Sequence, residues 1–158
     1  MAWFSNQWKL NDVCHVTIKI APDVMDVDFY DATVCTLFIE DMLKSFSLHK
    51  APLYAYCVLV DHVHLITKFT AEPSKIMHTL KSHSANLINR HLGRAGAFWQ
   101  PKSWDVIIRD KVHFINTCFY VWNNPVKAEL VNAMGAYPFS NYLQMKDTIE
   151  KVATELFD

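Results

Sequence analysis

The pattern of apolar and polar positions divides the first half of the chain into recognisable elements. Val13 to Ile20 alternates with a period of two, which predicts a strand that Pro22 ends. Between Asp28 and Lys50 apolar residues recur every three or four positions, which predicts a helix; they are Phe29, Val34, Leu37, Phe38, Met42 and Phe46. Pro52 to Phe69 is long and rich in β-formers, and a turn at Val60–Asp61 would fold it into a hairpin.

The second half of the chain continues the alternation of helix and strand. Thr70 to Ser74 offers capping residues and a proline for the first turn of another helix, whose apolar face is Ile76, Met77, Leu80, Leu87, Ile88 and Leu92. Gly93 to Gly96 ends that helix, and Phe98 to Arg109 returns as a strand. Lys111 to about Asn124 forms a final helix, which Pro125 should end because a residue before proline avoids helical geometry.

This order of elements predicts the fold class. Strand, helix, strand, strand, helix, strand and helix together match a split βαβ arrangement with an added helix. We therefore expect an α+β fold, a ferredoxin-like sandwich with a central antiparallel sheet and an additional C-terminal helix. No repeat or flexible linker interrupts the 158 residues, so residues 1–158 are predicted to form a single domain with a peripheral acidic tail at 142–158.

Composition narrows the setting in which the protein works. The four cysteines stand singly in apolar segments, which is typical of reduced core residues in a cytoplasmic protein. The chain shows neither a leader pattern nor an apolar run long enough to span a bilayer, so export and membrane insertion are not expected. The formal net charge is -1, yet nine Lys or Arg face only three acids between His62 and Lys127. This asymmetry predicts a cationic working surface, or else a solvated basic face without a partner.

His62 and His64 are the first candidate for chemistry. Alternate side chains of a strand point to the same face, so these two imidazoles lie together while Val63 points to the other face. Such a pair can bind one metal ion. The alternative is two polar residues on the exposed face of a half-buried sheet.

The helix from Lys111 supplies a second candidate. Val112, Ile115, Cys118 or Phe119, and Trp122 make its predicted apolar face, while Tyr120 and Asn124 share the opposite side with His113, Asn116 and Thr117. Asn124 stands one turn beyond Tyr120 and can offer its amide oxygen to the same metal. A tyrosine at a helix edge can equally be an amphipathic filler with its hydroxyl in water.

The segment Phe98 to Trp104 interleaves aromatic and basic residues between Arg94 and Arg109. This mixture suits stacking on unpaired bases and neutralising phosphates. Trp99 and Trp104 can equally be anchors of the core.

Taken together, several ordered motifs resemble the single-tyrosine HUH transposases. They are AYCVLVDHVHL at 55–65, WQP at 99–101, VIIR at 106–109, YVWNNPVKAELV at 120–131 and YPFSNY at 137–142. The WQP and NPVK segments resemble in particular the REP-associated tyrosine transposases, and the resemblance runs from about Lys9 to Tyr142.

The resemblance implies a metal-dependent endonuclease and strand transferase of single-stranded DNA. His62 and His64 would hold the metal, Mg²⁺ or Mn²⁺, with help from Asn124, and Tyr120 would be the nucleophile that forms a 5′-phosphotyrosine. The implied partner is single-stranded DNA with a REP-like hairpin, bound by a monomer or homodimer. Candidate DNA contacts are Lys75, Lys81, Arg90, Arg94, Trp99, Lys102 and Arg109.

One departure from that family bears on its activity. Many relatives carry a histidine directly after the Trp-Asp or Trp-Glu pair, where this chain has Val106 after Trp104–Asp105. Two alternative functions stay open: a catalytically inactive module that binds DNA hairpins, and a metal-dependent phosphoesterase that does not use nucleic acid.

Overall fold

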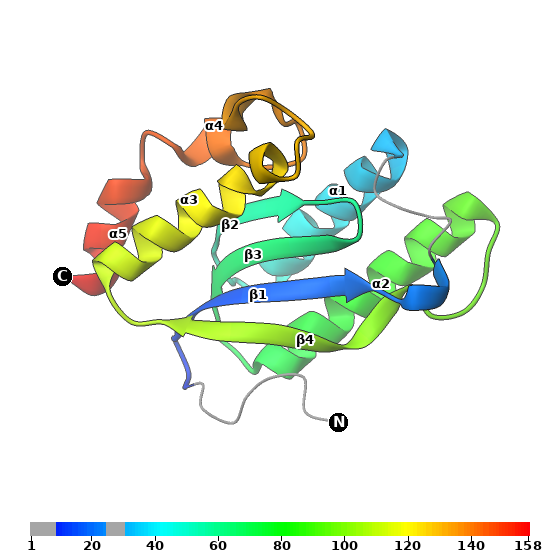
Figure 1. The fold of residues 1–158 in the computed structure, drawn as a ribbon. Coiled ribbons are helices and arrows are strands. Elements are labelled where there is room, and N and C mark those ends of the chain that lie inside the picture. Colours follow the sequence, from blue (N-terminus) through cyan, green and yellow to red (C-terminus); the bar gives the residue numbers. More distant parts are fainter. Residues whose placement is uncertain (1–8, 25–30) are drawn as a thin grey trace.

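The computed structural model describes residues 9–24 and 31–158, and its centre is a four-stranded antiparallel sheet (Figure 1). The strands are β1 (Val13–Ile20), β2 (Leu53–Val58), β3 (His62–Lys68) and β4 (Trp99–Ile108), in the spatial order β2-β3-β1-β4. This is the strand order of the predicted ferredoxin-like sandwich, which is thereby confirmed. The turn between β2 and β3 lies at Leu59–Asp61, as the hairpin prediction required.

Two long helices cover one face of the sheet: α1 (Ala32–Leu48) and α2 (Pro73–Leu92). Asp31 caps α1 by accepting a hydrogen bond from the Thr33 N–H at 2.8 Å. The predicted residues Asp28 and Phe29 lie outside the described residues. Pro73 opens α2, and Gly93 ends it in the left-handed region at φ 64°, where glycine has no steric penalty. A short 3-10 turn, η1 (Pro22–Val24), follows β1.

The opposite face of the sheet is covered by α3 (Lys111–Lys127), which lies over β2 and β3. The chain then forms η2 (Met134–Ala136), α4 (Tyr142–Met145) and α5 (Ile149–Phe157). The acidic tail at 142–158, expected to be peripheral, contains α4 and α5. Helix α5 buries Ile149 and Ala153 in the core beside α3. No helix among the residues described has the length and apolar character needed to cross a membrane.

Helix α3 corrects two predictions. It continues past Pro125 to Lys127, because the buried Pro125 ring packs in the core and its carbonyl still accepts from the Leu130 N–H at 2.9 Å. Its buried face is also rotated from the predicted one. Val112, expected to be apolar packing, is 67% exposed, whereas the helix buries Phe114, Cys118, Val121, Trp122 and Pro125. The prediction failed because three- and four-residue steps from Val112 and from Phe114 fit the sequence equally well.

The Asn141 side chain fixes α3 to the edge of the sheet. Its amide oxygen accepts hydrogen bonds from the Trp122 indole at 2.8 Å and from the Tyr56 backbone N–H at 2.9 Å. Its amide nitrogen donates to the Tyr54 carbonyl at 3.0 Å. All of these groups lie in or beside the core, where an unpaired polar atom costs about 1–3 kcal/mol. The YPFSNY segment is therefore the attachment between β2 and α3.

We predict that Asn141→Ala lowers the free energy of unfolding by about 2–4 kcal/mol, because it leaves the Trp122 indole and two backbone groups without a partner. Urea denaturation followed by tryptophan fluorescence measures the change. The matched control is Asn116→Ala, which removes an exposed amide from α3 and should change the free energy by no more than about 0.5 kcal/mol. Equal effects of both substitutions would contradict the anchoring role.

Candidate functional site

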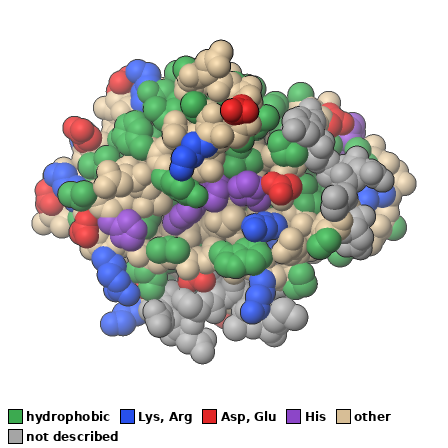
Figure 2. Space-filling view, in the orientation of Figure 1, with side chains coloured by type: hydrophobic (Ala, Val, Ile, Leu, Met, Phe, Trp, Pro, Cys, Tyr) green, Lys and Arg blue, Asp and Glu red, His purple; other side chains and the backbone are tan. Residues whose placement is uncertain are grey.

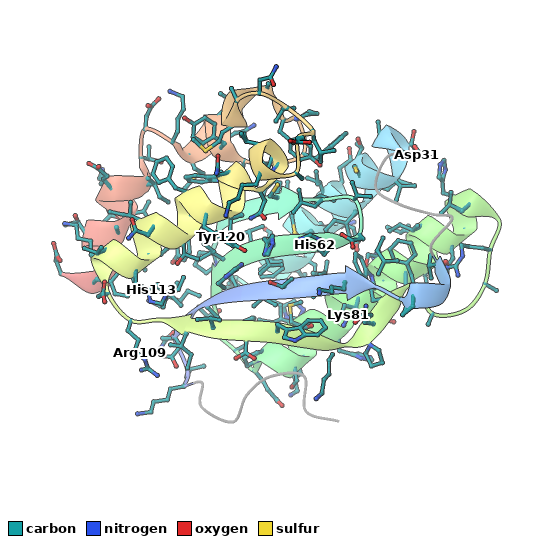
Figure 3. All side chains as sticks on the ribbon, in the orientation of Figure 1. Asp31, His62, Lys81, Arg109, His113 and Tyr120 are labelled. Carbon is teal, nitrogen blue, oxygen red and sulfur yellow. The ribbon has the colours of Figure 1, made fainter. Side chains whose placement is uncertain are left out.

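Strand register brings the candidate histidines together with residues of β1. Thr17 pairs with His64 and Lys19 pairs with His62, so alternate residues of β1 and β3 point to the face that α3 partly covers. His15 lies on the same face, one pleat further along β1. Figure 3 labels Tyr120 on α3 and His62 on the strand beneath it. The predicted common face of His62 and His64 is confirmed.

The imidazoles form a continuous hydrogen-bonded chain. His62 Nε2 lies 3.2 Å from His64 Nε2, and His64 Nδ1 lies 2.9 Å from His15 Nε2 and 3.1 Å from Thr17 Oγ1. At the other end, His62 Nδ1 lies 2.6 Å from the Asp61 carboxylate. Histidine side chains accordingly form a row across the middle of this face in Figure 2.

Two arrangements of ring protons satisfy this chain of nitrogens. In both, His62 donates its Nδ1 proton to Asp61, so His62 Nε2 carries a lone pair. In the first arrangement, His15 donates to His64 and His64 donates to His62. In the second, His64 donates from Nδ1 to His15 or Thr17, and the Nε2 lone pairs of His62 and His64 face each other. The second arrangement is favourable only when a cation lies beside both nitrogens.

The buried imidazoles are held in their neutral form. Burial is the main cause that lowers the pKa of His64 to about 3, and the positive charges that His15, His62 and Lys19 would carry contribute to this shift. Burial likewise lowers the pKa of His15 to about 4, with a smaller contribution from His113. At neutral pH both rings therefore keep a free lone pair, which is the form that can accept a hydrogen bond or bind a metal.

Helix α3 places Tyr120 and Asn124 over the imidazoles. The Tyr120 ring centroid lies 5.8 Å from that of His64 and 6.0 Å from that of His15. Asn124 donates its amide N–H to the Tyr120 carbonyl at 2.8 Å, so its amide oxygen is directed away from that bond. His62, His64, Tyr120 and Asn124 line one groove of about 380 Å³, and 46% of the Tyr120 side chain is exposed.

The candidate metal ligands among the groove's imidazoles are His62 and His64. Within residues 9–24 and 31–158, no group of three or more His, Cys, Asp or Glu side chains is arranged to hold a metal ion. A separation of 3.2 Å between His62 Nε2 and His64 Nε2 matches two nitrogens that each lie about 2.0–2.1 Å from one ion. The remaining ligands would have to be oxygens, of which Asn124 supplies one within the groove.

Two predicted DNA contacts are wrong, because their side chains are buried on the other side of the sheet. Only 6% of Trp99 is exposed, and its indole N–H donates to Ser84 Oγ at 2.9 Å. Lys81 is 5% exposed, and its ammonium donates to the Gln100 carbonyl at 2.6 Å. The WQP motif therefore anchors the start of β4 to α2, and Trp99 is the core anchor that the alternative interpretation described.

The other predicted cations are spread over both layers. Lys75 and Arg90 belong to α2, and Arg94 follows its end, so these three lie behind the sheet as seen from Tyr120. Arg94 also donates to the Asn89 side chain. Lys102 lies on β4 and Arg109 directly after it, both exposed, and Figure 3 shows Arg109 near His113 at the far end of β4 from His62.

Three residues in or beside the groove were missed by sequence reasoning. His15 contacts His64 directly, Lys19 Nζ lies 4.9 Å from the Trp104 ring centroid, and Lys127 Nζ lies 5.5 Å from the Tyr120 ring centroid. The predicted ferredoxin-like fold contained the signal for the first two, because this fold places β1 beside β3. Odd-numbered residues of β1 then share a face with His62 and His64.

We predict that metal-free protein loses stability as the pH falls below 6.5, because the unfolded chain binds protons on His15 and His64 that the folded chain does not. The free energy of unfolding should fall by up to about 1.4 kcal/mol per pH unit for each histidine, and the full contribution returns above pH 6.5. Urea denaturation at several pH values measures the slope. His15→Phe should reduce the slope of the free energy of unfolding against pH to roughly half. The control His78→Asn, on the exposed face of α2, should leave this slope unchanged. An unchanged slope in His15→Phe would contradict the prediction.

Comparison with known proteins agrees with this fold. A solved structure of a REP-associated tyrosine transposase bound to a REP hairpin superposes with a TM-score of 0.74 at 19% sequence identity, covering 100% of this chain and 89% of the other. A transposase structure from Deinococcus radiodurans gives a TM-score of 0.51 at 17% identity, covering 75% of this chain and 95% of the other.

Sequence comparison identifies the family. A curated protein of Haemophilus influenzae, assigned as a REP-associated tyrosine transposase, is 27% identical over 106 residues. The match covers 56% of this chain and 57% of that relative, so the chain spans little more than half the relative's length. The family model "Transposase IS200 like" matches residues 31–124, which is more than half of the chain and contains the two histidines, Tyr120 and Asn124. The chain therefore belongs to the IS200-like transposases.

Proposed function

We propose that this transposase-family protein is a metal-dependent single-stranded DNA endonuclease and strand transferase that uses Tyr120 as its nucleophile. The observation that carries the proposal is the convergence, in one groove, of two facing imidazole nitrogens 3.2 Å apart with the phenol of Tyr120 and the amide of Asn124. The structural neighbour bound to a REP hairpin supports hairpin DNA as the partner. Such a reaction on chromosomal DNA would take place in the cytoplasm.

The metal would be held by His62, His64 and Asn124. When bound, a divalent cation such as Mg²⁺ or Mn²⁺ polarises the scissile phosphate and offsets its charge. The Asp61 carboxylate orients His62 through Nδ1, and His15 with Thr17 orients His64 through Nδ1. Hydrogen bonds of this kind fix the tautomer and ring orientation of a metal-binding histidine.

Tyr120 would supply the covalent chemistry. Its phenolic oxygen forms a bond to phosphorus, the bond from phosphorus to the 3′ oxygen breaks, and the phenolic proton leaves to solvent while the 3′ oxygen takes one up. The products are a 5′-phosphotyrosine and a free 3′-hydroxyl, and attack by a 3′-hydroxyl reverses the step. Lys127, whose ammonium lies 5.5 Å from the Tyr120 ring centroid, adds positive charge where the phosphate would approach.

Formation of the covalent adduct tests the proposed function. We predict that the protein forms an SDS-resistant adduct with a hairpin oligonucleotide in the presence of Mn²⁺, and that the adduct carries a label placed at the 3′ end. Tyr120→Phe should abolish the adduct, because the ring remains while the attacking oxygen is gone, and should leave hairpin binding intact. The control Tyr142→Phe removes a phenolic oxygen near Trp122 and should form adduct normally.

Other outcomes would support the alternatives. Adduct that persists in Tyr120→Phe would place the nucleophile elsewhere. Hairpin binding without cleavage under any divalent metal would indicate an inactive binding module. Hydrolysis of a small phosphodiester that survives Tyr120→Phe would indicate a phosphoesterase that does not use this tyrosine.

The hydrogen bond from His64 to His15 gives a second prediction. His15→Phe keeps an aromatic ring of similar size and removes the acceptor, so we expect Mn²⁺ to bind about 10- to 100-fold more weakly to the DNA-free protein. Electron paramagnetic resonance of free Mn²⁺ measures the affinity. His15→Asn, which keeps an acceptor, should recover part of it, and the control His113→Phe should change it little. Unaltered affinity in His15→Phe would show that Thr17 alone orients His64.

A further inference from the structure

Helix α3 packs mainly on β2 and β3 (Figure 1), and among the described residues it leaves part of the same face of β1 and β4 exposed. Two large apolar side chains of β4 point from this open face: Trp104 is 47% exposed and Val106 is 53% exposed. An indole left in solvent on a sheet face is unusual, because tryptophan is highly buried on average.

The exposed indole lies in the same groove as the catalytic candidates. Across the sheet, Thr17 pairs with His64 on one side and with Trp104 on the other, so the three residues form one row. Two strand spacings separate Trp104 from His64 in this row, which is about 10 Å between backbones. Trp104, Tyr120 and both metal-ligand candidates line the groove of about 380 Å³.

The surroundings of Trp104 are cationic and polar. Lys19 Nζ lies over the Trp104 ring, 4.9 Å from its centroid, and the exposed residue Lys102 stands two positions before Trp104 on β4. Thr17 is the residue of β1 that pairs directly with Trp104. In Figure 2, Lys and Arg side chains lie next to hydrophobic ones along the lower side of the histidine row. The open face therefore offers one flat aromatic surface together with positive charge.

We propose that Trp104 is a stacking platform for an unpaired base of the DNA strand whose scissile phosphate reaches Tyr120, with Lys19 facing the phosphate of that nucleotide. The proposal rests on the proposed function, since it names where the substrate strand lies in the same groove. A nucleotide carries both features that this surface matches, a planar base and an adjacent negative charge. A second copy of the chain fits less well, because the Lys19 ammonium lies over the ring and would lose water in an apolar contact.

Binding measurements without metal test this platform separately from cleavage. We expect Trp104→Ala to weaken binding of a hairpin with single-stranded flanks by about 5- to 150-fold, and Trp104→Phe, which keeps a stacking ring, to weaken it much less. Fluorescence anisotropy of a labelled oligonucleotide measures the affinity. The control Val112→Ala shortens a side chain that is 67% exposed on α3 and should leave the affinity unchanged.

An abasic scan of the flanks identifies the stacked base. One abasic position should weaken binding to the wild-type protein and have little effect on Trp104→Ala, because the same contact cannot be lost twice. Additive losses at every position would overturn the proposal. The proposal would also be overturned if no abasic position weakened binding and Trp104→Ala changed only the oligomeric state measured by light scattering. In that case a second copy of the chain would cover the ring.

These readouts separate the inference from the proposed function. If the wild-type protein forms the covalent adduct but Trp104→Ala shows the wild-type affinity and the wild-type response to each abasic position, the stacking platform is refuted and the enzymatic function stands. If no adduct forms but one abasic position couples to Trp104, the platform stands and the enzymatic function is refuted.

Discussion

The position of α3 on the sheet depends on one side chain, the buried amide of Asn141. Its oxygen and nitrogen together join the Trp122 indole of α3 to two backbone groups of β2. Tyr120 lies two residues before Trp122 and Asn124 two residues after it, so the same attachment sets how these two side chains meet the imidazoles. Because α3 is fixed at the β2 edge and packs mainly on β2 and β3, the groove lies beside it, with α3 residues on one side and Trp104 of β4 on the other.

The imidazoles of His15 and His64 are largely buried, whereas the aromatic residues of the groove are partly exposed. Burial keeps His15 and His64 neutral, so that under the proposed function His64 can bind the metal while His15 orients its ring. Tyr120 and Trp104 are about half exposed, which a site for a large anionic polymer needs. Both conditions are met within one face because β1 provides polar residues next to β3, and α3 packs mainly on β2 and β3.

Much of this arrangement was predictable from the sequence, and the failures have particular causes. Period-two alternation placed His62 and His64 on one face, and the polar spacing of α3 placed Tyr120 with Asn124. Trp99 and Lys81 were misjudged because composition indicates which residues can stack or carry charge, while burial by α2 decides whether they do. The direction of the buried face of α3 also depends on a tertiary contact, the hydrogen bond from the Trp122 indole to Asn141. The sequence of the helix alone does not indicate this contact.

Contacts within the chain hold both halves of α3, and this bears on how many molecules are needed to form one site. Helix α5 packs beside its first half, where Lys111 Nζ lies 3.3 Å from the Asp158 carboxylate, and Asn141 holds its second half. Tyr120 therefore lies over the histidines of its own chain. Under the proposed function, a site complete within one molecule would react in first order with respect to bound protein. Diluting the complex would then leave the rate of the first strand cleavage per molecule unchanged.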